Sequence, residues 1–124
     1  MTSLINPRLL RAAAVSAGLA LAGLGGTASS ALARTCSAPK YPGNGYFTSL
    51  KVTGVSCSSG KRVALAHYRC RVKKGVQGKC SSRVNGMRCT ESRPSSGRTP
   101  AEYNARVTCK RGSKKVVVTY QQNL

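Results

Sequence analysis

Few side chains in this 124-residue sequence could act as an acid or a base in catalysis. His67 is the only histidine, and Glu91 and Glu102 are the only acidic residues. A ribonuclease-like hydrolase could use His67 and Glu91 to move protons, with Arg88 or Arg93 supplying positive charge. No motif places these groups together, so a packed histidine and glutamates that neutralise nearby arginines are the favoured interpretation. We therefore assign no catalytic residue and favour a protein that is not an enzyme.

Six cysteines are the second set of chemically reactive side chains. No two of them have the close Cys-x-x-Cys spacing of a metal site, and a single histidine adds little to one. Widely spaced cysteines in an exported chain are typical of a disulfide framework, so no metal or other cofactor is expected. The disulfide-forming residues are predicted to be Cys36, Cys57, Cys70, Cys80, Cys89 and Cys109.

The pairing of six cysteines has 15 possibilities, and spacing narrows them only in part. If Cys57 and Cys70 lie on one helix, they are about 20 Å apart, whereas a disulfide needs Cα atoms within roughly 7 Å. Cys70 and Cys80 flank a glycine-containing loop and could meet. The predicted pairs are Cys70–Cys80, Cys57–Cys109 and Cys36–Cys89.

Basic charge dominates the composition, with 21 lysines and arginines against two glutamates. Residues 34–124 keep 19 of these basic residues and both glutamates, which gives them a formal net charge of +17. Such a chain attracts polyanions by counterion release, whatever their sequence, although a merely solvated basic surface is the alternative. The expected partner is an anionic polymer or cell-envelope surface. The predicted polyanion-binding residues are Arg106, Lys110, Arg111, Lys114 and Lys115.

Sequence-specific recognition of nucleic acid is not expected. The chain has no recognition-helix motif and no RNP motif, and its aromatic content of 5% leaves few rings for stacking on bases. The segment 93–100 suggests another kind of partner, since it could present Arg98 to a trypsin-like protease as an inhibitor loop. An ordinary connecting loop is the favoured interpretation of this segment.

The N-terminal segment has the pattern of a Sec-type signal peptide. Arg8 and Arg11 accompany an apolar run over 9–24, and small residues follow up to Ala33. We expect cleavage near Ala33, so that 1–33 is a signal peptide and 34–124 a single secreted domain. The apolar run is too short and too rich in Gly and Ala for a membrane span, and none is expected in the mature form.

The secondary structure is predicted from hydrophobic periodicity. Residues 58–71 are Ala-rich with apolar residues at helical spacing, which predicts a helix, and the glycine-containing segment 73–79 is expected to be a loop. Residues 46–53 alternate, which predicts a strand. One face of this strand is expected to carry Tyr46, Thr48, Leu50 and Val52.

Two hairpins are also predicted. The Asn-Gly pair at 85–86 favours a two-residue turn in which Val84 faces Met87 and Ser82 faces Cys89. Residues 103–110 and 115–120 alternate strictly, and one register pairs their apolar residues: Val107–Val116, Ala105–Val118 and Tyr103–Tyr120. The other face is expected to carry Arg106, Thr108, Lys110, Lys115, Val117 and Thr119. Together these elements predict an α+β fold, with one helix packed on a small antiparallel sheet and stabilised by disulfides.

Four segments of the chain resemble a family of small, secreted, disulfide-containing actinobacterial proteins that is uncharacterised. The resemblance rests on Tyr46–Cys57 leading into 60–64, on Val84–Cys89, on Val107–Cys109 and on Lys115–Val117. It covers about Tyr46 to Gln122, with Met87 where the family usually has an aromatic residue. It implies the fold and the extracellular location, and it brings no activity, cofactor or catalytic residue.

The function expected from the sequence is therefore that of a secreted basic module that binds anionic surfaces or polymers. The alternatives are a secreted ribonuclease-like hydrolase that uses His67 and a glutamate, and a protease inhibitor that acts through 93–100.

Overall fold

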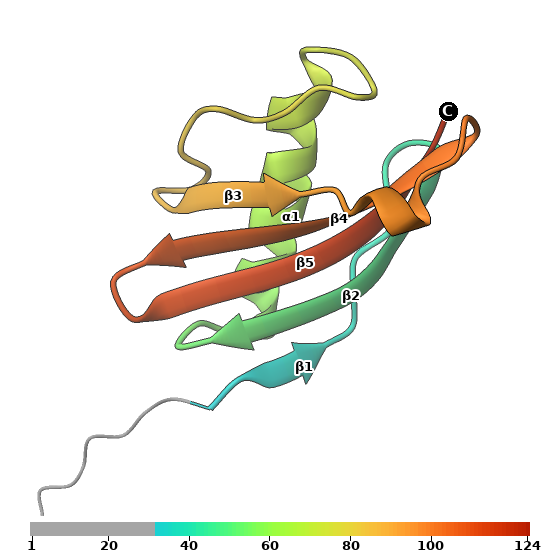
Figure 1. The fold of residues 1–124 in the computed structure, drawn as a ribbon. Helices are drawn as coiled ribbons and strands as arrows, with labels where there is room; N and C mark the ends of the chain where they lie inside the picture. Colours follow the sequence, from blue (N-terminus) through green and yellow to red (C-terminus); the bar gives the residue numbers. More distant parts are fainter. Residues whose placement is uncertain (1–31) are drawn as a thin grey trace, which may run out of the picture. The chain divides into compact units, whose positions relative to one another are not determined.

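Residues 32–124 are described in the computed structural model, and they confirm the predicted α+β fold. Five antiparallel strands form one sheet in the order β1-β2-β5-β4-β3, and one face of the sheet carries the helix α1 (Figure 1). The elements are β1 (Arg34–Cys36), β2 (Gly45–Thr53), α1 (Cys57–Val72), β3 (Arg88–Ser92), the 3₁₀ turn η2 (Ser95–Gly97), β4 (Glu102–Arg111) and β5 (Lys114–Asn123).

The predicted signal peptide lies, except for its last two residues, outside the described residues. Within 32–124, no helix is both long enough and apolar enough to cross a membrane.

Helix α1 begins at a serine cap and packs on the sheet through one stripe. The Ser56 hydroxyl accepts a hydrogen bond from the Ser59 N–H (3.0 Å), which satisfies one free donor of the first turn. The buried residues recur at helical spacing, as expected for one face of a helix on a sheet: Gly60, Val63, Ala64, His67 and Arg71. At Gly60 a side chain would collide with Val52 of β2, so this glycine allows the helix to lie close to the sheet.

Strand β2 contains a bulge that the sequence pattern did not reveal. Its pairing with β5 shifts between Phe47 and Ser49, so the alternation changes phase at this point. Leu50 and Val52 are buried as predicted, but Tyr46 is 60% exposed and Phe47 packs against the core instead. The predicted common face of Tyr46, Thr48, Leu50 and Val52 is therefore wrong for its first two members.

The β4–β5 hairpin is two residues out of the predicted register. Val107 lies opposite Val118, and Cys109 opposite Val116, around a two-residue turn at 112–113. Gly112 has φ +60°, the left-handed conformation required at the first position of a type II′ turn. A shift of two residues leaves every side chain on its own face, so the predicted buried faces are correct although the pairs are not.

The Asn-Gly turn is confirmed, with φ +49° at Asn85 and +80° at Gly86 and a bridge between Val84 and Met87. The predicted pairing of Ser82 with Cys89 is wrong, because the Val84–Met87 bridge is isolated and no strand of residues 32–124 includes Ser82.

Three disulfides join Cys36 to Cys57, Cys70 to Cys80, and Cys89 to Cys109. The predicted Cys70–Cys80 pair is confirmed, and the predicted Cys57–Cys109 and Cys36–Cys89 pairs are wrong. Strand β1 pairs with β2 and brings Cys36 beside Cys57 at the start of α1. The register of β3 and β4 places Cys89 directly opposite Cys109.

Candidate functional site

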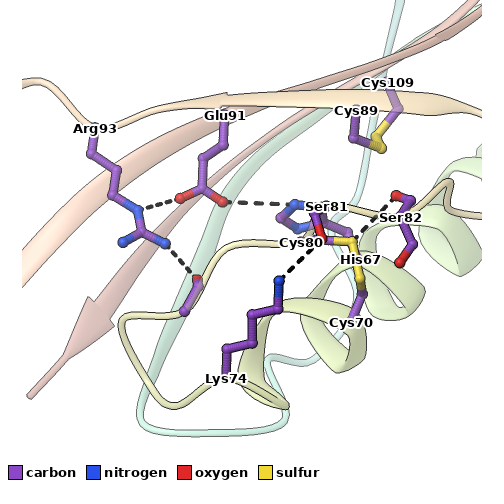
Figure 2. Close-up of a disulfide and its surroundings, with 11 residues drawn as sticks. His67, Cys70, Lys74, Cys80, Ser81, Ser82, Cys89, Glu91, Arg93 and Cys109 are labelled. Atoms are coloured by element: carbon purple, nitrogen blue, oxygen red, sulfur yellow. Dashed lines mark hydrogen bonds and ion pairs between the residues drawn. A yellow bond between two sulfur atoms is a disulfide. The ribbon is translucent and has the colours of Figure 1, made fainter.

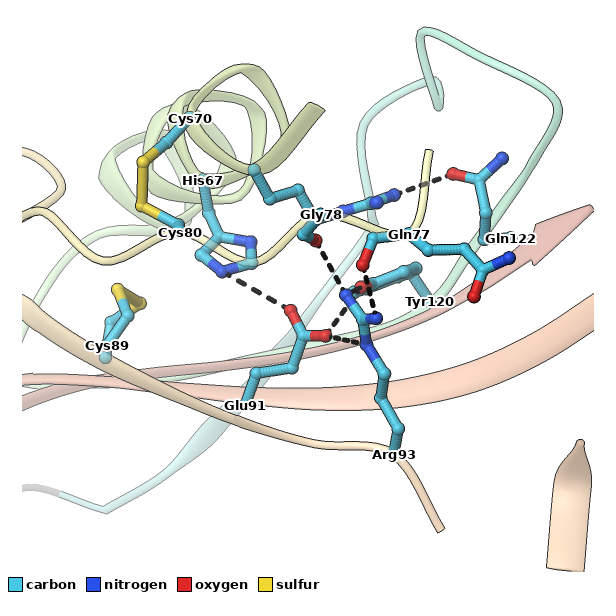
Figure 3. Close-up of polar contacts among 12 residues, drawn as sticks. His67, Cys70, Gln77, Gly78, Cys80, Cys89, Glu91, Arg93, Tyr120 and Gln122 are labelled. Carbon is cyan, nitrogen blue, oxygen red and sulfur yellow. Dashed lines mark hydrogen bonds and ion pairs between the residues drawn. A yellow bond between two sulfur atoms is a disulfide. The ribbon is translucent and has the colours of Figure 1, made fainter. Parts of the chain in front are cut away.

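The structure brings His67, Glu91 and Arg93 together between α1 and β3 (Figure 3). Nε2 of His67 lies 3.6 Å from Oε1 of Glu91. The other carboxylate oxygen of Glu91 accepts hydrogen bonds from Nε of Arg93 and from the Tyr120 hydroxyl, the latter at 3.0 Å. His67 and Arg93 thus both contact Glu91, an arrangement that the sequence alone did not reveal.

Both members of the His67–Glu91 pair are buried, with side chains 4% and 6% exposed. Burial lowers the pKa of His67, against the attraction of Glu91, so the imidazole is neutral at pH 7. Neither residue lines any of the four surface depressions described below. A substrate would have to open the helix–sheet interface to reach them, so the geometry favours a structural pair.

Arg71 is a second buried polar residue of α1, and its contacts lie next to those of Arg93. Its side chain is 1% exposed, and it donates to the carbonyl of Val76 (2.9 Å) and to the side-chain oxygen of Gln122 (2.7 Å). Its guanidinium also lies 4.3 Å from the centre of the Tyr120 ring. Carbonyl oxygens and a ring face therefore compensate the charge of Arg71, because no ion pair with a carboxylate is present within 32–124.

Arg71 and Arg93 together hold the loop that follows α1. Arg93 donates to the carbonyls of Gln77 (2.8 Å) and Gly78 (2.7 Å), next to the Val76 carbonyl that Arg71 binds. The Cys70–Cys80 disulfide closes the same loop, and Lys74 adds a hydrogen bond to Ser81 (Figure 2). The role of Arg71, Arg93 and the Cys70–Cys80 disulfide is therefore structural: they hold the loop after α1 against the sheet.

The remaining hydrolase and inhibitor candidates lie elsewhere. Glu102 begins β4, where it accepts a hydrogen bond from Gln121 (2.9 Å), and Arg88 lies on the opposite face of the sheet from Glu91. Arg98 follows η2 in an exposed position and donates to the Gln77 side chain (3.2 Å).

The face of the sheet that α1 does not cover is basic, and we call it the outer face. Arg88 of β3 lies directly opposite Lys110 of β4, and Lys110 lies opposite Lys115 of β5. Three positive residues therefore stand side by side across three strands. In the next row Thr90 lies opposite Thr108. The outer face has an open depression of about 500 Å³ lined by Arg88, Thr90, Arg106, Thr108, Lys110 and Lys115.

The five predicted polyanion-binding residues divide between two places. Arg106, Lys110 and Lys115 lie on the outer face. Arg111 and Lys114 lie opposite each other at the end of the hairpin, and they line a separate cavity beside α1.

Sequence reasoning missed Arg88 as a member of the basic row. The Asn-Gly turn indicates on which face of β3 Arg88 lies. No local pattern in the sequence, however, predicts that β3 pairs with β4. Two smaller depressions, one between β1 and the start of α1 and one beside η2, gather fewer basic residues.

Comparison with protein-family models, with curated proteins and with solved structures finds no match to this chain. Its function must therefore be argued from the residues themselves.

Proposed function

We propose that this protein is an exported, disulfide-stabilised, non-enzymatic module that binds anionic polymers or cell-envelope surfaces through the outer face of its sheet. The observation that carries the proposal is the row formed by Arg88, Lys110 and Lys115. Like charges directly opposite each other in a sheet cost stability, and here two such pairs are adjacent. An anionic ligand would relieve this repulsion on binding.

The surroundings of the row also support an anionic ligand. Arg106 extends the positive charge along β4, and the hydroxyls of Thr90 and Thr108 add hydrogen-bond donors between the charges. Glu102 is on the same face but eight residues along β4 from Lys110, roughly 26 Å away at the rise of a strand. Glu91 points to the other face, where Arg93 and Tyr120 hold it. The basic row therefore has no acidic neighbour within residues 32–124.

Binding to a short DNA duplex, and separately to heparin, measured over a series of salt concentrations, tests the proposal. A variant that carries Arg106→Gln, Lys110→Gln and Lys115→Gln is expected to bind DNA at least about tenfold more weakly at low salt. The slope of log K against log salt is expected to fall by up to about 3, since each phosphate contact contributes about 0.9.

The matched control removes the same charge elsewhere, with Lys40→Gln, Lys73→Gln and Lys79→Gln at exposed positions outside the outer face. This control is expected to retain most of the affinity and of the salt slope. If the control weakens binding as much as the outer-face variant does, binding depends on the total charge of the protein and not on the outer face. If the wild type does not bind either polyanion at low salt, the proposal is wrong.

Export is part of the proposal, and the three disulfides support it because such bonds persist in oxidising compartments. Expression of the full chain in a bacterium with a Sec pathway, followed by N-terminal sequencing of the product in the medium, tests it. A secreted product that begins near Arg34 is expected, and a chain retained in the cytoplasm with its first residues intact would overturn this part. The resemblance to a secreted actinobacterial family remains a proposal of the same kind.

A further inference from the structure

A second basic site lies on the helix-facing side of the β4–β5 turn. It is a cavity of about 230 Å³ between the start of α1, the Asn85–Gly86 turn and the end of the β4–β5 hairpin. We call it the hairpin cleft. Its lining divides into an apolar floor and a basic rim, and it contains no acidic residue.

The floor of the hairpin cleft lies against the edge of the core. Val63, Met87 and Val116 line it and are only 4%, 5% and 0% exposed, so their packing holds them in place. Val55 completes the floor from the segment before α1. Because Val63, Met87 and Val116 are almost fully covered, the apolar surface that a ligand would meet comes mainly from Val55 and from the aliphatic stems of the basic rim.

The rim carries three positive side chains from three different elements. Arg62 belongs to α1, Arg111 ends β4 and Lys114 begins β5. Among residues 32–124, Arg62 donates only to serine hydroxyls, of Ser58 (3.1 Å) and Ser59 (3.2 Å). No ion pair with a carboxylate of residues 32–124 neutralises any of the three.

Local backbone geometry places Arg111 over the Asn-Gly turn. A Cβ added at Gly86 would lie 2.9 Å from a terminal nitrogen of Arg111, so this guanidinium lies directly against the turn. Arg111 also lies directly opposite Lys114, a like-charged pair that is unfavourable on its own. The first turn of α1 has no acidic residue, so its partial positive charge adds to the same potential.

We propose that the hairpin cleft binds a phosphate monoester that carries a small apolar group. Two guanidinium groups and an ammonium suit a doubly charged anion with several oxygens. The hydroxyl of Ser59 and the amide of Asn85 line the same cleft and supply further donors. The apolar group packs against Val55 and the aliphatic stems of Arg62 and Lys114. At about 230 Å³ the cleft is smaller than the roughly 300–1,000 Å³ sites of drug-sized ligands, so a compact ester is the class that suits it.

This site is independent of the outer face. Arg111 and Lys114 point to the helix side of the hairpin, whereas Lys110 and Lys115, one row away, point to the other side. Polymer binding to the outer face and ester binding in the cleft can therefore be tested with separate variants.

Isothermal titration calorimetry with hexyl phosphate, inorganic phosphate and 1-hexanol tests the inference on the disulfide-bonded protein. Hexyl phosphate is expected to bind at least about threefold more tightly than inorganic phosphate, because its chain covers the small apolar area of the cleft, and hexanol is expected to show no binding. Arg111→Gln is expected to weaken hexyl phosphate binding at least about tenfold. Arg106→Gln on the outer face removes the same charge and is expected to change it less than about twofold. Thermal unfolding of both variants shows whether each one folds.

The source of the phosphate is distinguished by vesicles of phosphatidylcholine with and without phosphatidic acid. Binding that requires phosphatidic acid and is lost in Arg111→Gln but kept in Arg106→Gln supports a membrane-borne headgroup. Binding of hexyl phosphate without such vesicle binding supports a free ester.

Three results would overturn the inference. The first is inorganic phosphate binding as tightly as hexyl phosphate, because the apolar part of the cleft would then play no part. The second is a folded Arg111→Gln variant that binds hexyl phosphate as the wild type does. The third is a wild type that does not bind hexyl phosphate at millimolar concentration.

Discussion

Nε2 of His67 and Oε1 of Glu91 lie 3.6 Å apart, buried between α1 and the edge strand β3. This Glu91 oxygen is buried and has no hydrogen-bond partner among residues 32–124, whereas the other oxygen is held by Arg93 and Tyr120. The interface between α1 and β3 therefore contains a neutral imidazole beside a carboxylate oxygen that lacks a donor. Protonation of His67 would place a positive charge beside this Glu91 oxygen in the buried interface.

The first prediction concerns pH. The pKa of His67 is lowered in the folded state mainly by burial, while in the unfolded chain it is near 6.5. As pH falls below about 6.5, the unfolded state binds the proton first, so the free energy of unfolding decreases until folded His67 also becomes protonated. We expect His67→Gln to lose less stability than the wild type between about pH 7.5 and about pH 5. Urea unfolding at both pH values measures this, and parallel losses in the two proteins would contradict it.

The second prediction concerns Glu91. Glu91→Gln keeps the shape of the side chain but leaves the half-buried Arg93 without its counter-charge. Breaking one partner of a buried pair costs about 3–5 kcal/mol, and we expect a loss near the lower end because Arg93 keeps its bonds to backbone carbonyls. Glu102→Gln is the control, with an expected change within about 0.5 kcal/mol. Equal effects of the two substitutions in urea unfolding would contradict the importance of the cluster.

The third prediction concerns the shape of the guanidinium at position 71. Arg71→Lys keeps the charge, but a lysine cannot reach the Val76 carbonyl and the Gln122 side chain together as the planar fork does. We expect a loss of about 2–4 kcal/mol, comparable with other buried charges left without partners. Arg69→Lys, at an exposed position on the same helix, is expected to change stability by less than about 0.5 kcal/mol. Hydrogen exchange of the 76–78 amides is expected to become faster in Arg71→Lys alone.

The fourth prediction links the proposed function to stability. Lys110 stands between Arg88 and Lys115, so Lys110→Thr removes two unfavourable neighbours at once. We expect this variant to be more stable than the wild type by about 0.5–1 kcal/mol at low salt, and to bind DNA more weakly. Added salt screens the repulsion and is expected to remove the difference in stability. A variant that is destabilised at low salt would contradict repulsion within the row.

The inner face of the sheet was predictable because alternation has a period of two. Tyr103, Ala105 and Val107 are buried as their spacing indicates, although their partners across the hairpin lie two residues from the predicted ones. The bulge in β2 had no signal of its own, since Thr48 and Ser49 are ordinary strand residues. The phase change at that bulge explains why Tyr46 is exposed and Phe47 is packed.

For the candidate sites, the sequence predicted only that the surface is basic and did not predict how the basic residues are arranged. The excess of lysine and arginine indicated a basic surface, and the five named residues do belong to basic surfaces. Their division between the outer face and the hairpin cleft depends on which side of β4 and β5 each residue occupies. The row itself depends on the pairing of β3 with β4, a long-range contact with no local pattern. The Cys36–Cys57 disulfide was also not predictable, because it depends on the pairing of β1 with β2, which has no local pattern either.

The order of the disulfides along the chain has a consequence for biogenesis. The three bridges close consecutive segments of 21, 10 and 20 residues, and none of them encloses or crosses another. A polypeptide that emerges N-terminus first can therefore oxidise each pair of thiols before the next pair appears. Such a chain has little opportunity for mispairing when its cysteines are oxidised in this order.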